Sequence, residues 1–166
     1  MRGRWVRHVP AGGDPLYRPP QPGSGRWQRG AVIEGFYLAE DPQTAWAEWY
    51  RALAELGVAP MRQMPRDLWT YEVEILHVAE LSDADRLSRV GLDPPVPDRR
   101  QWPAYQAVGE AFWRDGWAGV LSSSAARPAA KVLCVFRPSL DMPGVISLPP
   151  PARHDEPPAP PRGLRT

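Results

Sequence analysis

The strongest periodic pattern in the chain is a stripe of large apolar side chains between residues 42 and 56. They recur at intervals of three and four residues, the spacing of an amphipathic helix. The stripe consists of Trp46, Trp49, Tyr50, Leu53 and Leu56. Asp41 and Pro42 stand where a cap and a first helical residue are expected, and Gly57 stands where a left-handed cap can end the helix. We therefore predict a helix from Pro42 to Leu56.

Other segments carry the signals of strands and shorter helices. Apolar and polar residues alternate from Leu68 to Val78, which predicts a half-buried strand. Further strands are predicted by the apolar runs Ala31–Ala39, Ala118–Leu121 and Val132–Phe136. Short helices are expected at Ser82–Val90, with Ser82 as its cap, and at Tyr105–Trp113, ending near Gly116. This mixture predicts a single domain of the α+β class.

The two ends of the chain differ from its middle. Residues 139–166 are rich in proline, which lacks a backbone N–H and fixes φ. We expect this Pro-rich tail to be largely disordered from about Pro149, with a role in binding a proline-recognising partner as the alternative. Residues 1–16 are expected to form an N-terminal arm, which leaves residues 17–138 as the folded domain.

Charge and cysteine content exclude several classes of protein. The chain has 19 arginines, one lysine and a net charge of +1, which argues against a general nucleic-acid binder. The chain contains no run of about 18 apolar residues, the length needed to span a membrane. The basic N-terminus lacks the apolar core of a secretory leader, so we expect a cytoplasmic protein. Cys134 has no partner for a disulfide, and no Cys/His cluster has the spacing of a zinc site.

Two places could carry chemistry on spacing alone. Glu48 lies on the predicted helix above Ala45 and Ala52, whose small side chains leave room for a ligand beside the carboxylate. It could equally be a solvated residue near Arg51. The second place is the run Ser122–Ser124, whose hydroxyls could bind phosphate or sugar oxygens or cap a turn. No hydrolase or phosphate-loop motif accompanies them, so the function stays open at this level.

A set of short motifs is informative through its order. It comprises Tyr17-Arg18, Gly25-Arg26-Trp27, Tyr37-Leu38-Ala39, Ala45-Trp46-Ala47-Glu48, Gln106-Ala107-Val108-Gly109, Gly119-Val120-Leu121 with Ser124-Ala125, and the strand Val132–Phe136. The set resembles the RES domain family, named for an arginine, a glutamate and a serine. The resemblance implies a fold similar to that of ADP-ribosyltransferase toxins, and the role of toxin in a bacterial toxin–antitoxin pair.

The resemblance also implies roles for individual residues. The family's catalytic residues are matched by Arg26, Glu48 and Ser124, with Arg18, Ser122 and Ser123 as alternatives. Substrate-binding roles fall to Tyr17, Arg18, Tyr37 and Gln106. Two positions depart from the family pattern, since Gln28 stands in place of an asparagine and Ser123 in place of a proline.

Members of this family are associated with cleavage of NAD⁺ at the nicotinamide–ribose bond, by water or by phosphate. The resemblance thus implies NAD as substrate, no cofactor and no metal, and a helix-turn-helix (Xre-type) antitoxin as partner. The residue types suit this chemistry, because arginine matches pyrophosphate oxygens and a carboxylate can stabilise positive charge on the ribose. The alternatives are ADP-ribosyl transfer to a protein and a non-catalytic interaction module.

Overall fold

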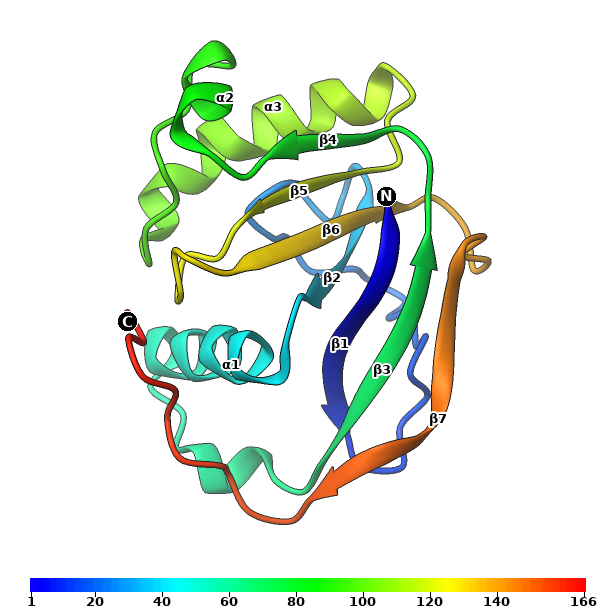
Figure 1. Ribbon diagram of the computed structural model, residues 1–166, viewed down its shortest axis with the longest axis vertical. Coiled ribbons are helices and arrows are strands. Elements are labelled where there is room, and N and C mark those ends of the chain that lie inside the picture. The colour runs from blue at the N-terminus through cyan, green and yellow to red at the C-terminus, as the bar shows by residue number, and fades with distance from the viewer.

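The computed structural model describes residues 1–166 as one seven-stranded mixed sheet with three α-helices (Figure 1). The strands are β1 (Arg2–Pro10), β2 (Glu34–Ala39), β3 (Arg66–Glu74), β4 (Val78–Leu81), β5 (Gly119–Ser123), β6 (Lys131–Arg137) and β7 (Val145–His154). The helices are α1 (Pro42–Leu56), α2 (Ala84–Arg89) and α3 (Trp102–Arg114), with short 3₁₀ turns at Pro60–Gln63 and Arg99–Gln101. Across the sheet the strand order is β4-β5-β6-β2-β1-β3-β7.

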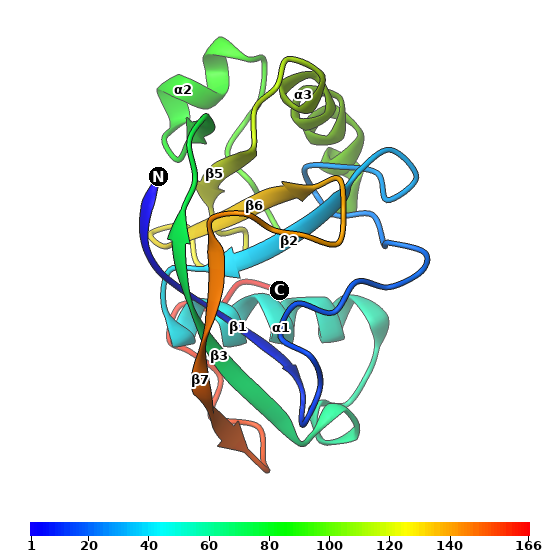
Figure 2. The ribbon, with the colours of Figure 1, turned by 90° about the vertical axis from the view of Figure 1, so that its right-hand side faces the viewer.

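The sheet consists of two halves that meet at one point. β4, β5, β6 and β2 form one half and β1, β3 and β7 the other, and the pair Val6–Ala39 alone joins β1 to β2. Within each half, neighbouring strands pair along much of their length. Figure 1 shows β1, β3 and β7 running steeply past the strands of the other half, and Figure 2 shows the same divergence from the side. Helix α1 packs beside the junction, against both β1 and β2.

Two apolar clusters hold these elements together. The first fastens the two halves of the sheet to each other and includes Trp5, Phe36, Tyr71 and Leu133, which come from β1, β2, β3 and β6. The second lies under α2 and α3 and includes Trp27, Leu87, Tyr105 and Val120. Burial of these large side chains is the main favourable contribution to folding.

The α+β class and the main elements are confirmed. Asp41 caps α1 by accepting a hydrogen bond from the Thr44 amide at 2.6 Å, and Gly57 ends the helix with a φ of 63°. The cap of α2 is Asp83 and not Ser82, because the Asp83 carboxylate accepts from the Arg86 amide. No helix has the length and apolar character needed to cross a membrane.

The structure differs from the prediction at both ends of the chain. Residues 1–16 are not an arm, because β1 lies inside the sheet and pairs with β3 along its whole length. The Pro-rich tail is not disordered from Pro149, because β7 runs to His154 and pairs with β3. Proline is tolerated there since β7 is an edge strand, where a missing N–H costs no ladder bond on the outer side.

Gly109 offers a test of the packing beneath the second cluster. A Cβ at this position of α3 would lie 2.0 Å from the Trp27 carbonyl oxygen, so any side chain must displace that segment. We expect Gly109→Ala to lower the free energy of unfolding by about 1–3 kcal/mol, although alanine normally stabilises a helix. Exposed Ala107→Gly is the matched control and should cost about 1 kcal/mol through helix propensity alone. Urea unfolding measures both, and a stabilised Gly109→Ala variant would contradict the close contact.

Candidate active site

A cavity of about 460 Å³ opens where the two halves of the sheet diverge. Its walls come from β1, β2 and α1, from the loop Gly23–Trp27, and from the ends of β3 and β5. Trp102 at the start of α3 completes the lining, and its indole N–H is buried without a hydrogen-bond partner. The volume is in the range typical of sites for small molecules and cofactors.

Glu48 projects into this cavity from the middle of α1. The neighbouring Ala45 and Ala52 also line it, so the small residues do leave room beside the carboxylate. One carboxylate oxygen, Oε2, accepts from Arg51 Nε at 2.9 Å. The other, Oε1, accepts from Ser124 Oγ at 2.6 Å and from the Ala126 amide at 3.3 Å. These donors hold the carboxylate in one orientation.

The three serines at the end of β5 have separate roles. Ser124 is buried at 1% exposure and donates to Glu48, but it is not part of the cavity wall. Ser122 lines the cavity and accepts from the Trp27 indole N–H at 3.1 Å, and Ser123 lines it and donates to the Ser82 carbonyl at 2.9 Å. Of the three hydroxyls, only that of Ser124 bonds to Glu48. Because Ser124 lies outside the cavity wall, it is a positioning residue for the carboxylate.

Arg26 lines the cavity from the loop Gly23–Trp27, and its side chain is held in place by several contacts. Its guanidinium donates to the Val96 carbonyl at 2.6 Å and to Gln101 Oε1 at 3.3 Å, and it lies 5.0 Å from the centre of the Tyr105 ring. Burial lowers the pKa of this guanidinium from its ordinary value. Gln106 is outside the cavity wall and supports the loop by donating to the Gly25 carbonyl at 2.8 Å.

Hydrogen bonds among Tyr37, Gln28 and Trp27 hold this loop against β2. The Tyr37 hydroxyl donates to Gln28 Oε1 at 2.9 Å and accepts from the Trp27 amide at 3.0 Å. Burial raises the pKa of Tyr37 well above its usual range, so the phenol stays protonated. A Cβ at Gly25 or Gly35 would approach the Tyr37 ring or the Gln28 amide within 3.0 Å. Glycine at these two positions therefore makes space for a glutamine.

The cavity carries an excess of positive charge. Four arginines line it against the single carboxylate of Glu48, namely Arg7, Arg26, Arg51 and Arg66. Arg7 projects from β1, with its guanidinium 4.2 Å from the centre of the Phe36 ring, and no carboxylate lies within ion-pair distance. Burial lowers the pKa of Arg7. A half-buried cation without an ion-pair partner favours an anionic ligand.

Arg66 is held by His8, its neighbour in the cavity wall. Arg66 Nε donates to His8 Nδ1 at 2.8 Å, and His8 Nε2 lies 3.2 Å from the Ala45 carbonyl. Both contacts suit a neutral imidazole that carries its proton on Nε2. Burial, with the Arg66 cation next to it, lowers the pKa of His8 to about 3. The ring also stacks on Trp46, with the centres 4.7 Å apart.

Besides Gln106, two more residues expected to bind substrate lie outside the cavity. Arg18 forms an ion pair with Glu34 at 3.0 Å, and Tyr17 is 60% exposed. The backbone carbonyl of Tyr17 accepts from Arg137, which also lies 3.8 Å from Glu34. These contacts tie the loop before Arg26 to the end of β6, so Arg18 has a structural partner and is not an alternative to Arg26 in this cavity.

Comparison with known proteins identifies the family of this chain. A family model described as the RES domain matches residues 2–155, and the chain belongs to the RES domain family. A probable NAD(+) phosphorylase of Mycobacterium tuberculosis is 31% identical over 118 residues, which cover 70% of this chain and 55% of that protein. The chain thus spans about half the length of that relative. The crystal structure of the M. tuberculosis MbcT–MbcA toxin–antitoxin complex contains a similar fold, with a TM-score of 0.71 and 24% identity over 89% of this chain and 85% of that one.

The neutral state of His8 makes a pH-dependent prediction. An unfolded histidine takes up a proton near pH 6.5, whereas folded His8 does so only near pH 3. The unfolded state therefore binds more protons between these values, and stability falls as pH falls from about 6.5 towards 3. His8→Gln keeps a donor and an acceptor but cannot titrate, so its loss of stability over this window should be smaller by up to about 1.4 kcal/mol per pH unit.

Urea unfolding at a series of pH values measures this difference. The comparison is between slopes, because the substitution also removes a stacked ring and lowers stability at pH 7. Equal slopes for His8→Gln and the unmodified protein would show that the His8 imidazole binds a proton in the folded protein as readily as in the unfolded chain, and would contradict the lowered pKa.

Proposed function

We propose that this protein cleaves NAD⁺ at the bond between nicotinamide and ribose. The observation that carries the proposal is a carboxylate, Glu48, fixed by Arg51, Ser124 and the Ala126 amide at a cavity whose other charged side chains are arginines. Membership of the RES domain family and similarity to a probable NAD(+) phosphorylase support it.

The charges of the cavity suit a dinucleotide. NAD⁺ carries two negative phosphate groups in its pyrophosphate, and Arg7 and Arg26 offer planar, multidentate donors for them. Arg7 is free to bind without giving up an ion pair, whereas Arg26 would exchange its bonds to Val96 and Gln101 for phosphate oxygens. The Trp102 ring and its unpartnered N–H provide an aromatic wall and one further donor.

In the proposed reaction the carbon–nitrogen bond between the ribose and nicotinamide breaks. The bonding electron pair leaves with nicotinamide, which becomes neutral, and positive charge develops on the ribose. The Glu48 carboxylate, oriented by its donors, stabilises this charge electrostatically or through a ribose hydroxyl. The acceptor then forms a new bond to the same carbon and loses a proton if it is water.

Phosphate is the acceptor that the arginine excess favours. Arg51 is paired with Glu48 and Glu55, which leaves Arg7, Arg26 and Arg66 as cations of the wall without a carboxylate partner. They are one more than the two charges of the pyrophosphate, and inorganic phosphate is an anion of the same chemistry. We further propose an antitoxin of the helix-turn-helix (Xre) type as partner and the cytoplasm as site of action, in keeping with the fold shared with a chain of a toxin–antitoxin complex.

Replacing Glu48 by glutamine tests the reaction. Glu48→Gln keeps the shape and removes the charge, so nicotinamide release should fall by at least about a hundredfold. Exposed Glu40→Gln changes the net charge equally and should retain full activity. Chromatography of the products with and without phosphate distinguishes ADP-ribose from its 1″-phosphate, and labelled NAD⁺ with lysate detects transfer to protein. Absence of nicotinamide release in every condition from folded protein would refute the proposal.

Replacing Arg7 separates ligand binding from structure. Arg7→Gln should raise KM for NAD⁺ by about tenfold or more, as expected for loss of a charged hydrogen bond. Arg18→Gln should instead lower the free energy of unfolding by about 1–3 kcal/mol, because Glu34 loses a partner, with KM unchanged. Steady-state kinetics and urea unfolding on both variants measure the contrast. The reverse pattern would place the anion site at Arg18.

A further inference from the structure

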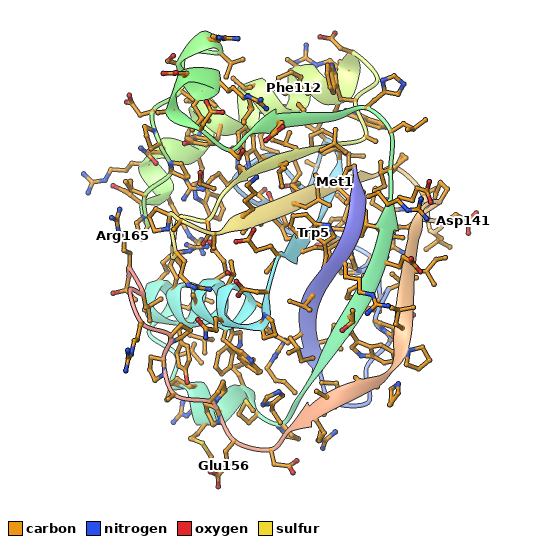
Figure 3. The ribbon with its side chains drawn as sticks, in the orientation of Figure 1. Met1, Trp5, Phe112, Asp141, Glu156 and Arg165 are labelled. Atoms are coloured by element: carbon orange, nitrogen blue, oxygen red, sulfur yellow. The ribbon has the colours of Figure 1, made fainter.

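The segment of residues 156–166, here called the strap, lies beyond the residues matched by the RES family model. It continues from β7 and runs along α1, so that its end lies beside that helix in both views (Figures 1 and 2). Figure 3 labels Glu156 and Arg165, which lie close to its two ends. The Tyr50 hydroxyl of α1 donates to the Pro158 carbonyl, which fastens the strap near its start.

The strap packs with one side against the domain. Pro157, Pro158, Pro161 and Leu164 are half-buried, whereas the charged Arg162 and Arg165 are exposed. The prolines at positions 157, 158, 160 and 161 fix φ at values typical of an extended polyproline II backbone in the stretch before the turn. The prolines that prevent a helix here therefore also pre-form the extended conformation that docks, at a low entropy cost.

A tight turn then directs the backbone towards the active site. The Leu164 amide donates to the Pro161 carbonyl at 3.3 Å, and Gly163 has a φ of 75°, which a non-glycine residue adopts only with strain. Beyond this turn the Arg165 amide donates to the Ala126 carbonyl at 2.9 Å. Ala126 is fully buried and follows the serines of β5.

This bond is the first of a continuous series that ends on Glu48. The next link is the peptide group between Ala126 and Arg127. Its carbonyl oxygen, that of Ala126, accepts the bond from Arg165, and its N–H, that of Arg127, donates to Ser124 Oγ at 2.9 Å. Ser124 Oγ in turn donates to Glu48 Oε1 at 2.6 Å. Each group accepts one hydrogen bond and donates the next, and such chains polarise one another. The series is therefore Arg165 amide, Ala126–Arg127 peptide, Ser124 hydroxyl and Glu48 carboxylate.

We infer that the strap is a positioning element for Glu48, acting through the Ala126–Arg127 peptide and the Ser124 hydroxyl. This inference rests on the proposed role of Glu48 in cleaving NAD⁺. The strap keeps the peptide in the orientation that presents the Arg127 N–H to Ser124, and this leaves the Ser124 proton for Glu48. A backbone amide of residue 165 thus contributes to turnover without touching the ligand.

The test removes the backbone donor of residue 165. Arg165→Pro replaces the amide hydrogen with a ring carbon, whereas Arg165→Ala removes the same side chain and keeps that donor, so it is the control for loss of the side chain. We expect Arg165→Pro to lower kcat for nicotinamide release by about three- to tenfold, the effect of losing one hydrogen bond, with KM for NAD⁺ unchanged. Arg165→Ala should behave as the unmodified protein. Equal kcat values for the two variants would overturn the inference.

A double-mutant cycle distinguishes relayed positioning from a general loss of structure. In a Ser124→Ala background the series is already interrupted, so Arg165→Pro should have no further effect on kcat. If the two effects instead combine independently, the strap does not act through Ser124 and the inference fails.

Amide exchange provides a readout that does not depend on catalysis. We expect hydrogen exchange of the Arg127 amide, followed by NMR, to be about three- to tenfold faster in Arg165→Pro than in Arg165→Ala. Unchanged exchange would overturn the inference even if NAD⁺ cleavage is observed. Conversely, if the unmodified protein releases no nicotinamide, the proposed function fails while the exchange result still decides whether the strap orients this peptide.

Discussion

The rest of the molecule depends on the narrow junction between β1 and β2. Because a single residue pair joins them, the two halves of the sheet diverge, and neither half can fill the space between them with its own ladder. Helix α1 packs against both strands there and brings a carboxylate to the cavity. The loop before β2 supplies Arg26 from the other side. A continuous sheet at this point would leave no cavity for these side chains to share.

The cavity combines a rigid anion with cations that lack full compensation. Glu48 receives hydrogen bonds on both oxygens, so its orientation is set before any ligand arrives. Arg7 has the opposite condition, a half-buried charge supported by an aromatic ring and by no carboxylate. Such a group is costly in the free protein and becomes favourable when an anion binds. A pre-organised carboxylate suits catalysis, and a cation without an ion-pair partner suits ligand binding, so the two ends of the cavity serve different purposes.

Much of the fold could be predicted from local patterns, and the exceptions have physical causes. The boundaries of α1 follow from its apolar period and its two caps, which depend only on neighbouring residues. β1 was misjudged because its arginines obscure the alternation and its partner β3 lies far away in sequence. The prolines of β7 indicate disorder unless the strand lies at an edge, which is a property of the whole sheet.

The same distinction applies to the site. Glu48 is recognisable from the alanines beside it and from the family motif. The place of Ser124 behind the carboxylate, and of Arg18 beside Glu34, depends on loop paths that no local pattern encodes. Arg7 and Arg66 were missed because their strands, β1 and β3, reach the cavity only in the folded sheet. Because β1 pairs with a strand on each side, a charged residue within it such as Arg7 needs an explanation, and that is the signal that could have indicated a binding role.

The central position of β1 also has a kinetic consequence. β1 cannot pair fully until β3 exists, and β2 needs β6, which comes later still in the chain. Pairing between such distant segments is slow, because the entropy of loop closure is lost before the contacts form. Arg7, Glu48 and Ser124 therefore meet only late in folding. A nascent chain carries the individual groups of the site long before it carries their arrangement, so the cavity forms only when the sheet has closed.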